Sequence, residues 1–326
     1  AYFNFYFLTL MLKRTFYTLL LSLFGVGVFA QQDALFTQYM FNNLYLTPAY
    51  AGVDGVTRFS VIHRSQWLGY QSSFGDGGAP TTTMASFNTP IYKLRSGAGV
   101  YVLRDQLGPQ NNLEAQASYA YHLGIKETKL SFGVKVGIYS QTINGKYYRY
   151  IQEGDPLIVE GKESQIRPDI GAGIFYRTEK YYAGVGFNHL LRSKFDFGAD
   201  SVRGALANHI NFTGGYFYEV SFDLKVQFST NVRTDLNKTQ FDVAGIAYIK
   251  DTMWGGVAFR QSEAASLLIG YSLLKDKSLK LGTAVDFIVK DRAAKENFSL
   301  EVMLSYDMPV NPGSGKKVVR TPRYRH

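Results

Sequence analysis

The sequence predicts an all-β protein: a transmembrane antiparallel up-and-down β-barrel of about fourteen strands, with a short N-terminal plug or periplasmic segment. Three observations lead to this fold class. Short segments after Gln31 place an apolar residue at every second position. A basic stretch and an apolar run precede them, as in a secretory signal peptide. Aromatic residues make up 15% of the chain, and such residues favour strands and membrane interfaces.

The alternation is clearest in two stretches. Between residues 220 and 232 the apolar set is Val220, Phe222, Leu224, Val226, Phe228, Thr230 and Val232. Between residues 129 and 138 it is Leu130, Phe132, Val134, Val136 and Ile138. Because successive strand side chains point to opposite faces, each stretch has one apolar and one polar face. In a soluble sandwich the apolar face meets another sheet, whereas in an outer-membrane barrel it meets lipid.

The start of the chain is predicted to be absent from the mature protein. Residues 1–10 are interpreted as a non-native upstream extension, and residues 11–30 as a signal peptide. The signal has a basic pair, an apolar run over Leu19–Phe29 and cleavage after Ala30. A retained anchor is the alternative, but the run is short for a spanning helix of about 20 residues. The chain has no Cys, which excludes a lipoprotein signal, disulfides and cysteine chemistry.

Residues 31–56 form an N-terminal segment outside the barrel pattern. They are rich in aromatic residues, and Pro48 forbids an ordinary central strand there. We predict a short helix near Phe36–Asn43 that ends in a turn at Pro48. Its apolar side chains need a surface to bury against, which the barrel's periplasmic mouth, its lumen or a partner could provide. We expect the segment to face the periplasm together with the C-terminal tail.

The barrel is predicted over residues 57–308. Its strands are expected near Thr57–Gln66, Thr81–Thr89, Gly97–Arg104, Leu113–Leu123, Thr128–Thr142, Arg167–Arg177, Tyr181–Leu191, Leu206–Phe217, Val220–Arg233, Thr239–Ile249, Trp254–Gln261, Ser266–Leu273, Leu279–Val289 and Ser299–Tyr306. Very short connections are expected at Lys126-Glu127, Glu179-Lys180 and Tyr218-Glu219, and long ones at Gln141 to Gln165 and Leu191 to Ala205. Short turns on one side and longer loops on the other are typical of outer-membrane barrels.

A basic tail, residues 309–326, is expected to follow the barrel. Its charges are Lys316, Lys317, Arg320, Arg323 and Arg325. The whole chain has a formal net charge of +9, and removal of Lys13 and Arg14 leaves 9 − 2 = +7. No helical recognition motif accompanies this charge, so nucleic acid is not expected as a partner.

The sequence offers no motif for catalysis, and we expect no enzyme activity, cofactor or metal. The five His residues do not stand at metal-ligand spacing, and no nucleophile elbow is present. Glycine pairs such as Gly97 with Gly99 and Gly184 with Gly186 lie inside strand patterns. They are interpreted as sites of close backbone approach, a bend or a crowded lumen. Asp223 and Asp286 are interpreted as lumen charges paired with Lys or Arg.

Several short motifs resemble the PorP/SprF family of type IX secretion system outer-membrane proteins of Bacteroidota. They are Gln38-Tyr39-Met40-Phe41-Asn42, Leu46-Thr47-Pro48-Ala49-Tyr50-Ala51-Gly52, Arg64-Ser65-Gln66-Trp67, Asp105-Gln106-Leu107-Gly108, Tyr119-Ala120-Tyr121 and Pro322-Arg323-Tyr324. The resemblance implies a non-enzymatic component of the secretion or gliding machinery that assists export or surface anchoring of secreted proteins or adhesins. The partners it implies are membrane lipid, secretion-ring or translocon components, and a large adhesin with a C-terminal export signal.

The residues expected to bind a partner or to form the plug come from the same motifs. They are Tyr39, Met40, Phe41, Asn42, Pro48, Tyr50, Arg64, Trp67, Arg323 and Tyr324. Three other functions remain open at this point: a channel or porin-like transporter for small solutes, a barrel enzyme and a soluble β-sandwich adhesin. The channel is the strongest of these, because strand patterns do not show whether the lumen is filled.

Overall fold

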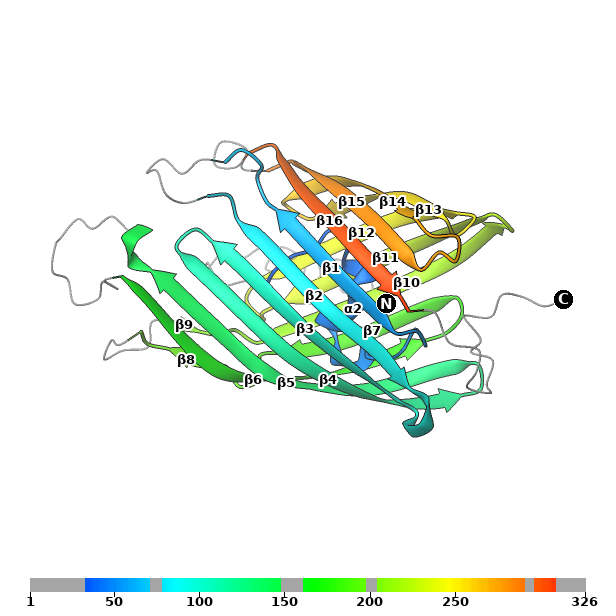
Figure 1. Cartoon of the computed structure of the whole chain (residues 1–326), viewed down its shortest axis with the longest axis horizontal. Helices are drawn as coiled ribbons and strands as arrows, with labels where there is room; N and C mark the ends of the chain where they lie inside the picture. Colours follow the sequence, from blue (N-terminus) through cyan, green and yellow to red (C-terminus); the bar gives the residue numbers. More distant parts are fainter. Residues whose placement is uncertain (1–32, 71–77, 148–160, 198–203, 291–295, 309–326) are drawn as a thin grey trace, which may run out of the picture. The chain divides into compact units, whose positions relative to one another are not determined.

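The strands, each with one apolar and one polar face, close into a single barrel. The computed structural model describes residues 33–70, 78–147, 161–197, 204–290 and 296–308. The expected extension, the signal peptide and the basic tail therefore lie outside the described residues. Each barrel strand pairs antiparallel with the next along the chain, except that β7 pairs with β10, and β1 closes the ring against β16. The closing seam runs from the pair Arg58 and Asp307 to the pair Ser65 and Leu300 (Figure 1).

The barrel has fourteen strands. They are β1 (Arg58–Ser65), β2 (Thr81–Ile91), β3 (Ser96–Leu107), β4 (Gln110–Ile125), β5 (Thr128–Asn144), β6 (Lys162–Arg177), β7 (Tyr181–Asn188), β10 (His209–Ser221), β11 (Leu224–Thr234), β12 (Thr239–Ile249), β13 (Met253–Arg260), β14 (Ala264–Ser272), β15 (Leu279–Ile288) and β16 (Phe298–Asp307). The predicted fold class and each predicted strand are confirmed.

Two local predictions were wrong, and one feature was not predicted. The turn expected at Tyr218-Glu219 lies instead at Phe222-Asp223, because β10 continues to Ser221. Asp223 is thus an exposed turn residue and not a lumen charge. The connection after β7 also contains a small two-stranded sheet of its own, β8 (Lys194–Phe195) with β9 (Gly204–Ala205).

The two faces of the sheet are those of a transmembrane barrel. In β14, Leu267, Ile269 and Tyr271 are exposed on the outside, and the residues between them face the lumen and are buried. In β5, Val134 is 60% exposed, whereas Lys135 beside it is 2% exposed. An apolar outer belt around a polar interior is the arrangement that lipid requires of a closed barrel.

The two ends of the barrel differ in their connections. At one end, here called the short-turn end, β4–β5, β6–β7 and β10–β11 are joined by two or three residues, and β2–β3 by η3 (Tyr92–Leu94). β16 ends and β1 begins at this end. The opposite end, the long-loop end, carries the connections β1–β2, β5–β6 with η4 (Gly145–Tyr147), and β7–β10.

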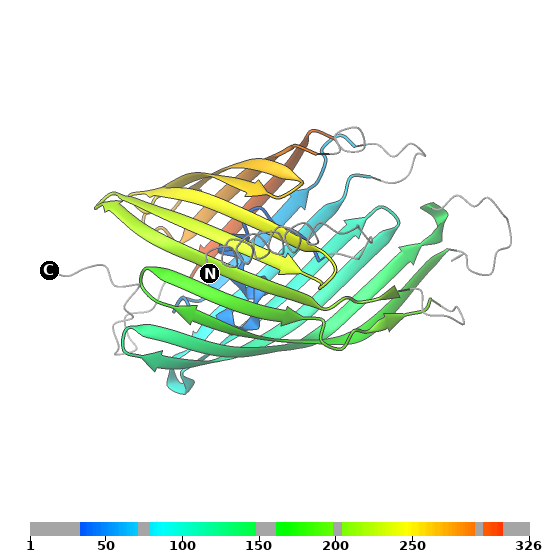
Figure 2. The ribbon, with the colours of Figure 1, turned by 180° about the vertical axis from the view of Figure 1, so that it is seen from behind.

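The described part of the N-terminal segment, residues 33–56, lies inside the lumen. It forms three short turns, η1 (Tyr39–Phe41), α2 (Asn43–Leu46) and η2 (Pro48–Tyr50), in place of the single helix predicted over Phe36–Asn43. Figure 1 and Figure 2 both show this blue segment within the ring of strands. The expectation that the segment faces the periplasm was therefore wrong. No described helix is long and apolar enough to cross a membrane.

Candidate functional site

Residues 33–57, the plug segment, pass through the lumen from one end of the barrel to the other. Asp33 lies near His189 and His209, which flank the β7–β10 connection at the long-loop end. Asp54 pairs with Arg58, the first residue of β1, at the short-turn end. The contact between this segment and the inner wall is therefore a candidate functional site.

Glycines of the wall admit the backbone of the plug segment. A Cβ at Gly133 would lie 2.3 Å from the Ala49 nitrogen, and one at Gly186 would lie 2.0 Å from the Leu46 carbonyl oxygen. Gly97 meets the segment in the same way. Atoms this close cannot coexist, so these positions exclude every side chain. The interpretation of the strand glycines as sites of close backbone approach agrees with these distances.

Arg64 holds the start of the plug segment through two buried carboxylates. Its Nη1 lies 2.6 Å from an oxygen of Asp286 and 3.4 Å from one of Glu301, and it donates a 2.8 Å hydrogen bond to Thr37 Oγ1. The two oxygens of Glu301 accept the backbone N–H groups of Thr37 and Gln38, at 2.7 and 2.9 Å. The backbone N–H groups of the plug segment therefore donate to a charged side chain of the wall, and hydrogen bonds to charged groups are stronger than those between neutral groups.

A second arginine extends this network along the wall. Arg260 lies 2.8 Å from Asp242, and it donates a 2.9 Å hydrogen bond to the Phe36 carbonyl. Both arginines also lie 3.7 Å from Glu263, at the turn between β13 and β14. Burial raises the pKa of Glu263, but Arg260 and then Arg64 outweigh it and hold the pKa below its ordinary value. Glu263 and the two arginines thus carry opposite charges that compensate one another.

Apolar side chains of the plug fill the space between these polar anchors. Phe36, Tyr45 and Leu46 are each at most 3% exposed and belong to one cluster with wall residues such as Tyr101 and Met303. The ring of Tyr45 packs edge-on against Phe36 at 5.7 Å and against Tyr101 at 5.6 Å. Each large side chain buried in this way stabilises the docked segment by up to about 1.5–3 kcal/mol.

At the short-turn end the segment is fastened by an ion pair and by hydrogen bonds that involve side chains. Asp54 lies 2.7 Å from Arg58, and Tyr50 donates a hydrogen bond to the same carboxylate. Asn88 accepts the Gly52 N–H at 2.6 Å. Burial raises the pKa of Asp54, but Arg58 and the Tyr50 hydroxyl more than offset this, and the pKa lies below its ordinary 3.8.

The pH dependence of this anchor follows from that lowered pKa. Asp54→Asn should destabilise the barrel at neutral pH by about 1–3 kcal/mol, because Arg58 loses a charged partner. A carboxyl group whose pKa is lower in the folded state than in the unfolded state stabilises the fold at pH values above its unfolded-state pKa. That contribution is lost as the pH falls through the folded-state pKa. The difference between wild type and variant should therefore shrink below about pH 4. Thermal unfolding midpoints of the two proteins between about pH 7 and about pH 3 measure this difference. A difference that stays constant with pH would contradict a stabilising ion pair between Asp54 and Arg58.

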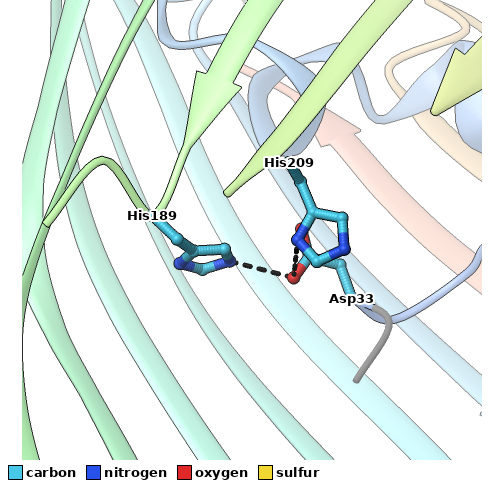
Figure 3. A group of neighbouring side chains, drawn as sticks. All are labelled: Asp33, His189 and His209. Atoms are coloured by element: carbon cyan, nitrogen blue, oxygen red, sulfur yellow. Dashed lines mark hydrogen bonds and ion pairs between the residues drawn. The ribbon is translucent and has the colours of Figure 1, made fainter. Parts of the chain in front are cut away.

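At the long-loop end, Asp33 meets two imidazoles (Figure 3). One oxygen of its carboxylate lies 2.9 Å from His189 Nε2 and 3.2 Å from His209 Nδ1. Burial alone would lower the pKa of His189, but Asp33 and Asp169 raise it to about 10. Burial disfavours ionised Asp33, but the two histidines hold its pKa well below its ordinary range. Sequence spacing did not indicate this group, because β7 and β10 become neighbours only in the folded sheet.

Most of the residues expected to form the plug or to bind a partner lie in the lumen. Those that are buried there are Tyr39, Met40, Asn42, Pro48, Tyr50 and Arg64. Phe41 is half-buried, with its ring 5.6 Å from that of Trp254. Trp67 lies beyond the end of β1, where its ring packs against Tyr70. Arg323 and Tyr324 lie outside the described residues. Sequence reasoning missed Glu301, Arg260 and Gly133.

Comparison with known proteins gives one family and a set of solved barrels. The family model described as "Type IX secretion system membrane protein PorP/SprF" matches residues 28–306. No protein with a curated description matches the chain.

Among solved structures, the chain is similar to the toluene transporter TbuX of Ralstonia pickettii, with 10% identity, a TM-score of 0.50, and coverage of 82% of this chain and 93% of that one. It is also similar to the toluene transporter TodX of P. putida, at 9% identity and a TM-score of 0.49, covering 82% and 95% of the two chains. Omp33 of Acinetobacter baumannii matches at 6% identity and a TM-score of 0.45, with coverage of 78% of this chain and 99% of that one. At these identities the likeness to TbuX shows the fold alone.

Proposed function

We propose that this chain, which belongs to the PorP/SprF family of type IX secretion system membrane proteins, is a non-enzymatic outer-membrane component of that system or of the gliding machinery. In this role it assists export or surface anchoring of secreted proteins or adhesins. The observation that carries the proposal is the family match, which spans all but the last residue of the barrel.

The filled lumen supports a docking role over a conducting one. The plug segment occupies the lumen along its length, and its Ala49 and Leu46 are at most 1% exposed. A solute pathway would need this segment to leave its place, against the hydrogen bonds with Glu301 and Arg64 that hold Thr37 and Gln38. We therefore assign function to the surfaces at the two ends of the barrel.

The short-turn end is the proposed side for secretion partners. Short turns of outer-membrane barrels face the periplasm, where a secretion ring or translocon would be met. Leu94, Phe222 and Leu274 are exposed apolar residues of these turns. Since β16 ends at this side, the basic tail of residues 309–326 would begin there. In this proposal the signal peptide, residues 11–30, is removed after Ala30 before the barrel enters the outer membrane.

Detergent pull-down of the tagged protein from a Bacteroidota outer membrane, followed by mass spectrometry, tests the proposal. We expect type IX ring or translocon components, or a large adhesin with a C-terminal export signal, to be recovered with it. Recovery of ring components indicates a core role, and recovery of one adhesin indicates a cargo-specific role. A barrel that is folded and brings neither would overturn the proposal, and conductance in planar bilayers would then test the channel alternative.

Deletion of Pro312–His326 should abolish recovery of these partners and leave the barrel folded. We expect partner binding to be lost because the basic tail would contact the partner at the short-turn end. Co-purification is the measurement, and the gel shift of the unheated barrel in SDS is the control for folding. Partner recovery at the wild-type level from the truncated chain would assign the contact to the turns instead.

A further inference from the structure

The group at the long-loop end unites three side chains that are far apart in the sequence. Asp33 begins the plug segment, His189 follows β7, and His209 opens β10. The antiparallel register places His209 opposite Asn188, so the two imidazoles come together, with ring centroids 5.8 Å apart. One ligand atom from each residue can be chosen so that all three lie within 4.8 Å of one another. Figure 3 shows both rings turned toward the Asp33 carboxylate.

His209 has an unfulfilled hydrogen-bonding capacity. It is 3% exposed, and neither of its ring nitrogens has a hydrogen-bond partner among the described residues. Its Nδ1 lies 3.2 Å from the Asp33 oxygen, but the geometry is not that of a hydrogen bond. A buried polar group without a partner has lost its hydration and gained no hydrogen bond in return, so this arrangement needs a reason.

A second layer of residues orients His189. Its Nδ1 lies 3.0 Å from Asp169, which also accepts a 2.8 Å hydrogen bond from Gln116 Nε2. His189 and Asp169 are each about 1% exposed. An imidazole whose one nitrogen donates to a carboxylate presents the other nitrogen in a fixed direction, which is how metal-binding histidines are held. Here the presented nitrogen is Nε2, and it points at Asp33.

The geometry points to a binding site for one divalent transition-metal ion of the zinc class, held by Asp33 Oδ1, His189 Nε2 and His209 Nδ1. Ligands about 2.0–2.1 Å from a tetrahedral ion are separated by about 3.3 Å. The present separations of 2.9 and 3.2 Å from the Asp33 oxygen are close to that. Two imidazoles and one carboxylate suit zinc, cobalt or nickel, whereas calcium and magnesium prefer oxygen alone.

The ion would have three protein ligands and one water molecule, and its role is to link two parts of the chain. It takes the place of the proton between His189 and Asp33, and it uses the nitrogen lone pair that His209 otherwise leaves unbound. Since Asp33 belongs to the plug segment and both histidines belong to the wall, the ion joins the two at the long-loop end. Asp54 and Arg58 join them at the other end. This site is independent of the secretion role.

Titration of the purified full barrel with Co²⁺ tests the inference. The protein is prepared with a tag free of histidine, stripped with a chelator, and titrated in detergent. We expect one Co²⁺ per chain with the visible absorption of a tetrahedral ion, and Zn²⁺ should displace it. His209→Gln should abolish this binding, and Asp169→Asn, which removes the carboxylate that orients His189, should weaken it about 10–100-fold.

The control variant is His63→Gln, because His63 is an exposed residue of β1 that is hydrogen-bonded to Thr83 and is not part of the proposed site. It should bind Co²⁺ like the wild type. The SDS gel shift of each unheated barrel reports folding, and Asp33→Asn provides a second ligand variant if His209→Gln does not fold. The inference is overturned if the wild type takes up no stoichiometric Co²⁺. It is equally overturned if a folded His209→Gln or Asp33→Asn barrel binds it with wild-type affinity.

Discussion

Gly133→Val should dislodge the plug segment and open the lumen. A Cβ at this position would lie 2.3 Å from the Ala49 nitrogen and 2.4 Å from its Cα, both backbone atoms of η2 that no rotamer change can move. Overpacking of a tight core costs about 1–3 kcal/mol, and a collision with backbone lies at or above the top of that range. We expect a lower unfolding midpoint and the appearance of ion conductance in planar bilayers.

Gly124→Val is the matched control for this substitution. Gly124 lies in β4, next to β5, and a Cβ there meets nothing within 4 Å. Valine favours strands, so this variant should keep the wild-type midpoint and the wild-type conductance. If Gly133→Val had the same midpoint and conductance as Gly124→Val, the contact between Gly133 and the plug segment would not be what keeps the lumen closed.

Arg64→Met should destabilise the barrel strongly. It leaves Asp286 and Glu301, each at most 1% exposed, without their cation. Removal of one partner from a buried ion pair costs about 3–5 kcal/mol, because the remaining charge is left uncompensated. Unfolding in urea, followed by the gel shift or by tryptophan fluorescence, measures the loss of free energy.

A second substitution separates charge from packing in this prediction. Adding Asp286→Asn to Arg64→Met removes one of the stranded charges and should restore part of the lost stability. Arg167→Met is the surface control, because Arg167 lies 3.9 Å from an exposed Asp196 and such pairs contribute under about 1 kcal/mol. No recovery in the double variant would indicate that Arg64 acts mainly by filling space.

The strands could be predicted because lipid and lumen impose opposite demands on neighbouring residues. Val134 and Val136 face outward on either side of the buried Lys135, and that alternation is visible in the sequence. The β10–β11 turn could not be placed, because apolar residues such as Val220 and Phe222 continue the alternation through it. Alternation marks faces but does not mark where a strand reverses.

The plug could be predicted only in part. Its aromatic residues indicated a need for burial, but the sequence alone does not reveal which surface covers them. Glu301 and Arg260 look like ordinary polar strand positions, and their role arises only when β13 and β16 bring them to the plug segment. The same reason explains why His189 and His209 were not identified, since they lie twenty positions apart in the sequence and only strand pairing joins them.

The plug segment is also a tethered ligand of its own barrel. Only a few residues separate Val53, still buried in the lumen, from Arg58 at the start of β1. A short linker of this kind holds a binding segment at a local concentration of the order of millimolar. If the segment leaves the lumen it therefore returns readily, and a competitor that occupies the lumen must either match that local concentration or bind far more tightly.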